Sequence, residues 1–305
     1  MWSVGDGDCG RLGHGGEATD NVTSPRRIAL TLPVRCVAAG DAFGLALLFD
    51  GNIWSWGDNQ LGQLGWGGRK SSLSDEPNCT PRPVKGGKAV ECIAAGATHC
   101  AAVTKDGHVL TWGANAHGQL GFPPSADDSD FEDDLDGEES EGGTATEEDS
   151  TSSESDEFDE YADFGASIRT GAGQFDNAPK TRKSKKNAAT GPLCSTRPKV
   201  LDALAQHGDD VTVVAAACGR EHTAVLTRAH VVYTFGCGRF GRLGHGSTKN
   251  ARGRELSSPG FPKSCFKPKA VTRMKEHKVF HVACGVQSTL AITQVGELSN
   301  SSAQA

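Results

Sequence analysis

The stretch WSWGDNQLGQLGWG, Trp54 to Gly67, decides the fold because versions of it recur along the chain. Each version has a leading glycine, four further residues and then Gly-(Gln/Arg)-Leu-Gly. A nucleotide-binding glycine loop needs a single copy that opens a helix, whereas a motif repeated within one chain is typical of a repeat architecture. The stretch therefore predicts architecture, and its leading glycines are Gly5, Gly57, Gly113 and Gly236.

A second glycine element precedes each complete copy at a fixed distance. Its first version reads VAAGDAFGLAL. The first glycine of the element lies 17 residues before the leading glycine of the same repeat. A fourth version, VACGVQSTLAI, has no aromatic-glycine segment after it. The two elements stay in phase, which a chance match would not do. The glycines of this second element are Gly40, Gly96, Gly219 and Gly285.

The residues around the leading glycine read as a β-strand. Trp54 and Trp56 share one parity and Ser55 the other, as in a half-buried strand whose aromatic side faces the core. Trp112 takes the place of Trp56 in the next repeat. The strand after this loop is predicted from Pro-basic-apolar segments such as Pro81 to Val84, because proline is tolerated at the edge of a sheet.

Tight turns are predicted between the second and third strands. Asp50-Gly51 and Asp106-Gly107 are hairpin signals in which both turn residues accept positive φ. Ala229-His230 stands at this place in the third repeat, so a different turn type is expected there. Four short antiparallel strands in a unit of about fifty residues form a blade of a β-propeller.

The repeats resemble those of the regulator of chromosome condensation family. The resemblance rests on the aromatic-glycine pair, the GQLG or GRLGHG loop and the AAG-x-x-H strand start at His99 and His222. It implies an all-β propeller of seven blades, of which about four four-stranded blades are present here. Either the ring is an incomplete or open arc, which we expect, or Met1 to Val4 close a small ring by pairing with the last blade.

The charge is divided unevenly along the chain. Residues 127–163 hold 19 of the 38 acidic residues and no Lys or Arg, which leaves a formal charge of +12 on the rest of the chain. Such a segment cannot bury enough apolar surface to fold, so disorder is expected. We predict propeller blades over 1–121 and 193–296, an acidic insertion ending in a basic cluster over 122–192, and a polar tail over 297–305.

The insertion carries two sets of candidate regulatory residues. Four hydroxyl residues have an acidic residue three positions later, the pattern that acid-directed kinases favour. The sequence KTRKSKK resembles a short nuclear localisation signal, although it could instead be a solvated counter-charge to the acidic run. An internal contact between the acidic run and the basic propeller is a further hypothesis. The candidate residues are Ser129, Thr146, Thr151 and Ser153 for phosphorylation and Lys180, Arg182, Lys183, Lys185 and Lys186 for import.

Catalysis and metal binding find little support in the sequence. The ten cysteines include no Cys-x-x-Cys pair, and the repeat register makes several of them small core residues. His14 and His245 recur in the LGHG loop, which favours hydrogen bonding within the turn over ligation or general-base chemistry. No cofactor and no small-molecule substrate are expected. No apolar run is long enough for a membrane span and no signal sequence is evident, so an intracellular protein of the cytoplasm, the nucleus or both is expected.

Three functions remain open at this point. The first is a non-catalytic module that binds a protein partner as a scaffold or regulator. The second, implied by the founding member of the family, is guanine-nucleotide exchange on a Ran-like small GTPase; the projecting wedge that this activity requires has no match here. The third is association with chromatin or nucleic acid through basic residues, which neutralise phosphates. We predict the binding module.

Overall fold

The computed structural model describes residues 1–16, 19–67, 78–123, 194–205, 211–246, 264–294 and 298–300, with only the backbone of Ala205 and of 298–300. The chain divides into two compact units, Met1–Asp130 with Ala189–Ala305, and Phe131–Ala188. All the described residues belong to the first unit. Residues 124–193 lie outside the described residues, so the candidate phosphorylation sites, the candidate import signal and the whole acidic run of 127–163 stay sequence predictions.

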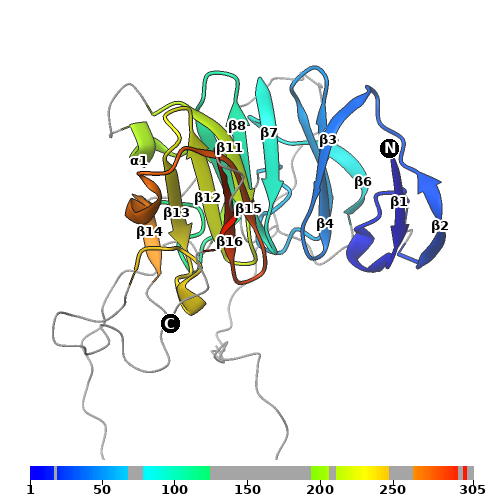
Figure 1. The fold of residues 1–305 in the computed structure, drawn as a ribbon. Coiled ribbons are helices and arrows are strands. Elements are labelled where there is room, and N and C mark those ends of the chain that lie inside the picture. Colours follow the sequence, from blue (N-terminus) through cyan, green and yellow to red (C-terminus); the bar gives the residue numbers. More distant parts are fainter. Residues whose placement is uncertain are drawn as a thin grey trace, which may run out of the picture. The chain divides into compact units, whose positions relative to one another are not determined.

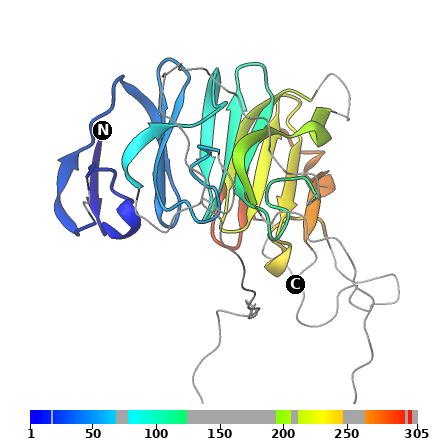
Figure 2. The ribbon, with the colours of Figure 1, turned by 180° about the vertical axis from the view of Figure 1, so that it is seen from behind.

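The fold is a series of antiparallel sheets that follow one another in chain order (Figures 1 and 2). We number the sheets I to V. Sheet I has two strands, sheets II to IV have four each, and sheet V has three. The strands are β1 Trp2–Gly5 and β2 Val22–Arg27 in sheet I; β3 Val34–Ala39, β4 Phe43–Leu48, β5 Ile53–Gly57 and β6 Asn78–Pro83 in sheet II; β7 Val90–Ala95, β8 His99–Thr104, β9 Val109–Ala114 and β10 Cys194–Val200 in sheet III; β11 Val213–Cys218, β12 His222–Thr227, β13 Val232–Gly236 and β14 Cys265–Ala270 in sheet IV; β15 Val279–Cys284, β16 Thr289–Thr293 and β17 Leu298–Asn300 in sheet V.

Helical structure is short in the described residues. The 3-10 turns η1 Asp8–Gly10 and η3 Arg239–Gly241 lie in the motif loops that follow β1 and β13. The turn η4 Thr272–Met274 and the helix α1 Asp202–Ala205 follow the last strands of sheets IV and III. None of the helices that the structure describes is long and apolar enough to cross a membrane.

Sheets II to V contact one another through their first strands, whereas sheet I contacts sheet II through η1. Strand β7 contacts β3 and β11, and β11 contacts β15. In the described residues β1 pairs with β2 alone, and no strand of sheet V pairs with it. The expected open arc is confirmed, and closure through Met1 to Val4 is not found.

The outer strand of sheet III lies beyond the insertion. Cys194 pairs with Ala114, and Val200 pairs with Leu110, so residues on both sides of 124–193 form one sheet. The prolines of the Pro-basic-apolar segments lie in the last strand of their sheets, β2, β6, β10 and β14, as predicted for an edge.

The expectation of half-buried strands is wrong for the middle strands of sheets II to IV. All six residues of β4, β9 and β12 are buried, and Ser55 in β5 is more buried than either of its neighbours. Both faces are covered because each inner sheet lies between two others. The buried hydroxyls are satisfied locally: Ser55 Oγ donates to Leu64 O at 2.7 Å and Thr111 Oγ1 to Leu120 O at 2.8 Å.

The turns between the second and third strands also differ from the expectation. Gly51 N donates to Leu48 O, and Gly51 has φ +85°, but Asp50 does not take positive φ. The third repeat was expected to differ, yet His230 N donates to Thr227 O, and His230 has φ +63°. All three repeats thus share one type of turn, in which a single residue has a left-handed conformation. That residue is glycine in the first two repeats and His230 in the third.

Candidate functional site

The leading glycines of the repeat motif open the loops that follow the third strands. Gly57, Gly113 and Gly236 have φ of +105°, +96° and +108°. A Cβ on Gly57 would lie 2.5 Å from Ala42 O, and one on Gly113 would lie 2.6 Å from Thr98 O. Only glycine combines this conformation with this approach of the backbone. Gly5 has φ +121° and begins the same loop in sheet I.

The glycines of the second element make room for the side chain three residues later. A Cβ on Gly40 would lie 2.0 Å from the Phe43 ring, and one on Gly96 would lie 2.3 Å from the His99 ring. Gly219 stands in the same relation to His222.

The histidines that begin β8 and β12 join neighbouring sheets. Nε2 of His99 lies 3.0 Å from Oγ1 of Thr223 in sheet IV, and that hydroxyl donates to Gln119 O at 2.8 Å. Since the hydroxyl proton is used, His99 must donate from Nε2. His222, Thr289 and Arg242 O repeat the arrangement between sheets IV and V, with distances of 3.0 and 2.7 Å.

Burial keeps both imidazoles neutral. It lowers the pKa of His99 to about 3, helped by neighbouring His222, and lowers the pKa of His222 to about 4, helped by the Arg242 guanidinium. Nδ1 of both rings is buried and has no hydrogen-bond partner among the described residues. The geometry supports an inter-sheet connection and offers neither ring to a substrate.

The tryptophans of the motif make the corresponding contacts between the earlier sheets. Trp56 Nε1 donates to Arg11 O, and Trp112 Nε1 donates to Gln63 O, both at 2.9 Å. The carbonyl before the Leu-Gly pair of one loop thus accepts a hydrogen bond from the next sheet at every junction. The donor is Thr223 between sheets III and IV, where Phe235 stands in place of a tryptophan, and Thr289 between sheets IV and V.

The substitution Trp112→Phe tests how much one such hydrogen bond contributes to the free energy of unfolding. The phenyl ring fills most of the site but leaves Gln63 O with the weaker Cys100 Sγ donor at 3.3 Å. We expect the free energy of unfolding in urea to fall by about 1–2 kcal/mol, because a buried carbonyl loses its best donor. Phe235→Trp is the matched opposite change, and overpacking should make it destabilising as well. Unchanged stability of the Trp112 variant would show that this hydrogen bond does not hold the junction.

The ring after each Leu-Gly pair contacts its own sheet, either the strand before the loop or the last strand. His14 Nε2 lies 2.8 Å from Ser3 Oγ, and His245 Nε2 lies 2.8 Å from Thr234 Oγ1, so these histidines form hydrogen bonds as predicted, but to the strand before the loop and not within the turn. Two sheets have aromatic rings instead. The guanidinium of Arg82 lies 5.0 Å from the centre of the Trp66 ring, and Lys199 Nζ lies 5.9 Å from that of Phe122.

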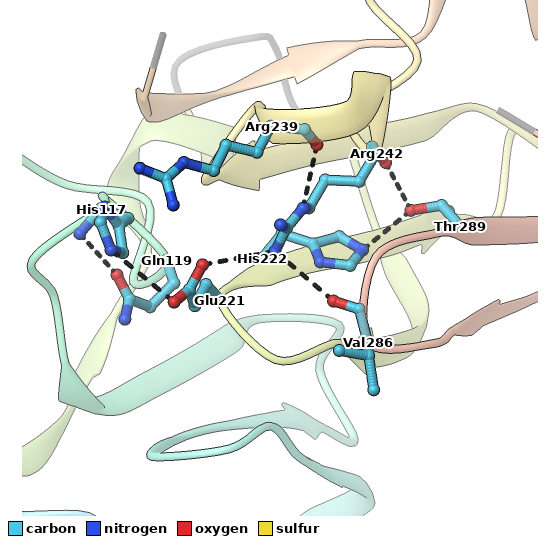
Figure 3. Close-up of polar contacts among 8 residues, drawn as sticks. All are labelled: His117, Gln119, Glu221, His222, Arg239, Arg242, Val286 and Thr289. Atoms are coloured by element: carbon cyan, nitrogen blue, oxygen red, sulfur yellow. Dashed lines mark hydrogen bonds and ion pairs between the residues drawn. The ribbon is translucent and has the colours of Figure 1, made fainter. Parts of the chain in front are cut away.

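A polar cluster lies where the loops of sheets III, IV and V meet (Figure 3). The side chain of Arg242 is 3% exposed, and its Nη1 lies 3.4 Å from Glu221 Oε2 and 3.4 Å from Val286 O. Its Nε donates to Arg239 O at 3.1 Å. His117 Nε2 lies 3.9 Å from the other oxygen of Glu221. Arg242 therefore links the η3 loop to the first turns of its own sheet and of sheet V.

Phe240 lies at the tip of the η3 loop, and its side chain is 63% exposed. Its φ of +58° is left-handed, which costs a bulky L-residue about 1–2 kcal/mol. The Arg242 guanidinium lies 5.7 Å from its ring centre, and Val286 across the sheet boundary is 58% exposed. We call Arg220, Arg239, Phe240 and Val286 the loop-end patch; all four are exposed.

The described residues contain no group of three or more His, Cys, Asp or Glu side chains arranged to hold a metal ion. All ten cysteines carry free thiols. Burial raises the pKa of Cys284 to about 12 and raises that of Cys100 as well, so these thiols stay protonated and unreactive.

Sequence reasoning did not identify the loop-end patch. Phe240 is equivalent to Leu61 and His117 in the other repeats, and Arg242 to Gln63 and Gln119. The differences between aligned copies of the loop were therefore the available signal, although nothing in the sequence places Glu221 and Val286 beside Arg242.

Four-stranded antiparallel sheets that join through their first strands and their motif loops define this chain as a repeat β-propeller. Models of the "Regulator of chromosome condensation (RCC1) repeat" match residues 50–103 and 230–292 and, in a second form, residues 34–63 and 90–119. The chain belongs to the RCC1 family of repeat proteins.

The sequences of known proteins and a solved structure are also similar to this chain. "Probable E3 ubiquitin-protein ligase HERC6" of Homo sapiens is 32% identical over 266 residues, which cover 83% of this chain and 23% of HERC6. "Ultraviolet-B receptor UVR8" of Arabidopsis thaliana is 37% identical over 129 residues, covering 42% of this chain and 28% of UVR8. The structure of Prp20p from Saccharomyces cerevisiae has a TM-score of 0.59 at 21% identity and covers 95% of this chain and 50% of Prp20p. The matched part thus spans less than a third of HERC6 or UVR8 and half of Prp20p.

Proposed function

We propose that this chain is a non-catalytic β-propeller module that binds a protein partner through its loop-end patch. One observation carries the proposal: Phe240 is held exposed at a loop tip in a backbone conformation that is unfavourable for its side chain. Strained, exposed residues cluster at functional sites, and aromatic side chains and arginines dominate the energetics of protein interfaces. Arg242 donates hydrogen bonds to Arg239 O in the η3 loop and to Val286 O in sheet V. These contacts within the chain hold the loop in place without a bound protein.

Phe240→Gly separates binding from folding. Glycine adopts φ +58° without a Cβ penalty, so stability should stay level or rise by about 1 kcal/mol. Loss of the aromatic side chain should weaken partner binding by about tenfold or more. Cys9→Gly is the matched control, because Cys9 holds the same place in the sheet I loop, also with φ +58°.

The partner for this measurement is found by crosslinking. A photoreactive benzoylphenylalanine replaces Phe240 or, as the control, Phe49, which is 69% exposed in the turn at the opposite ends of the strands. A protein captured at 240 and not at 49 should lose affinity for the Phe240→Gly chain. Identical capture at both positions, or full affinity of that variant, would refute the assignment of the patch.

Guanine-nucleotide exchange on a Ran-like GTPase is the second candidate. It is favoured by the likeness to Prp20p, a protein described by its binding properties to Gsp1p and histones. Release of labelled GDP from purified Ran, measured with and without this chain, tests it. We expect the intrinsic release rate to be unchanged; acceleration would place exchange first. Binding of purified histones tests the third candidate, chromatin association.

A further inference from the structure

The end of the propeller that carries the motif loops is electrically polarised. Over sheets I and II the exposed or half-buried charges at this end include Asp6 and Asp58 in the motif loops and Asp41 in the β3–β4 turn, and Asp6 pairs with Arg11 at 2.9 Å. Over sheet IV they include Arg220 in the β11–β12 turn and Arg239 in η3. Both sets lie at the same end, because in each antiparallel sheet the first turn and the third loop share an end.

The two arginines of the loop-end patch are available to a ligand. Neither guanidinium forms an ion pair with a residue that the structure describes, and Figure 3 shows the Arg239 side chain extending away from that of Arg242. The nearest carboxylate, Glu221, already faces Arg242 at 3.4 Å. The charge that remains beside Phe240 is positive.

The apolar members of the patch come from two sheets. Phe240 lies at the end of sheet IV, and Val286 lies in the β15–β16 turn of sheet V. They are joined through Arg242, which stacks near the Phe240 ring and binds Val286 O. An apolar side chain that covered both residues would have its chain neighbours within reach of Arg239, which directly precedes Phe240.

We infer that the loop-end patch selects a protein segment in which an apolar side chain is flanked by Asp or Glu. This inference rests on the proposed function and names the chemistry of its partner. Exposed phenylalanine and valine remove apolar surface of the ligand from water, and the two guanidiniums, which pair with no carboxylate among the described residues, discriminate in favour of carboxylates. A nucleic acid fits less well, because the Arg242 guanidinium already lies over the Phe240 ring, where a base would stack.

The inference is tested with a displayed library of random 12-residue peptides, from which those that bind the full chain are selected. Peptides retained by the full chain but not by the Phe240→Gly chain should be enriched in Asp or Glu within three positions of Leu, Phe or another apolar residue. Synthetic copies of the enriched peptides should then bind about threefold or more weakly to Arg239→Glu, because attraction between exposed charges becomes repulsion. Arg228→Glu, the same change at the exposed β12–β13 turn, should leave binding unchanged.

The outcomes separate the inference from the proposed function. Enriched peptides that lack acidic residues, or equal binding to the Arg239→Glu chain, would overturn the inference and leave the proposed function standing. If every peptide retained by the full chain is retained equally well by the Phe240→Gly chain, both are refuted. A single-stranded oligonucleotide that competes with the peptides and is weakened by Phe240→Gly would assign the patch to nucleic acid instead.

Discussion

A chain carrying Gly219→Ala should lose about 2–4 kcal/mol of unfolding free energy, since a single methyl group forces apart a fully packed junction. A Cβ at this position would lie 2.1 Å from Cε1 of His222 and 2.5 Å from Gly285 O of sheet V. The imidazole cannot yield without breaking its hydrogen bond to Thr289, and the carbonyl belongs to the backbone of the next sheet. Urea denaturation followed by tryptophan fluorescence measures the loss.

Gly285→Ala is the matched control for this change. Gly285 takes the place of Gly219 in the last repeat, but a Cβ there would meet only Ser288 Oγ at 2.9 Å and Ser288 O at 4.0 Å. A serine hydroxyl can rotate away, so we expect a loss below about 1 kcal/mol. Equal losses in the two variants would mean that the backbone preference or the chain entropy of alanine, and not the steric contact with His222, decides the effect.

Stability should fall steeply in mild acid because two buried imidazoles must be protonated. The pKa values of His99 and His222 are about 3 and about 4 in the folded chain, against 6.5 for an exposed histidine. The folded state therefore binds fewer protons, so the stabilisation is complete above pH 6.5 and is lost as the pH falls from 6.5 towards 4. Between pH 6.5 and 4.5 each imidazole should remove roughly 2–3 kcal/mol.

A double substitution isolates this contribution from that of the carboxylates. His99→Gln with His222→Gln keeps an N–H donor for Thr223 and Thr289 and removes both titrating rings. Its unfolding free energy should be lower at pH 7.5 but should vary much less between pH 6.5 and 4.5. The same pH dependence in the double variant and in the unchanged chain would show that other groups control acid unfolding.

The propeller class could be predicted from the sequence because the signals are local and repeated. Three features each meet a structural requirement within a single blade. They are leading glycines with positive φ, hydroxyl residues that alternate with the aromatic residues of the third strand, and prolines in the last strand. Four in-phase copies make the pattern unambiguous. The matches to the RCC1 repeat and the sheet topology confirm it. The insertion after Gly121 could be recognised as foreign for the same reason, because it interrupts the repeat.

The errors arose where one sheet meets another or where the backbone overrides residue preference. Alternation predicted a solvent face for Ser55, but the neighbouring sheets bury both faces. The Ala229-His230 turn was expected to differ, yet His230 takes the left-handed position of glycine, with Nδ1 2.8 Å from Val279 O and its ring against Phe280. Contacts across a sheet boundary stabilise this conformation, and local propensity does not include them.

The sequence by itself determined the blade, its period and the residues that shape its turns, because these depend on contacts within about fifty residues. Only the tertiary structure decided the candidate site. Arg242 meets Glu221, 21 positions earlier, and Val286, 44 positions later, because the third loop of one sheet lies beside the first turn of the next. The stacking of sheets brings these residues together, and no pattern within a single repeat encodes that distance.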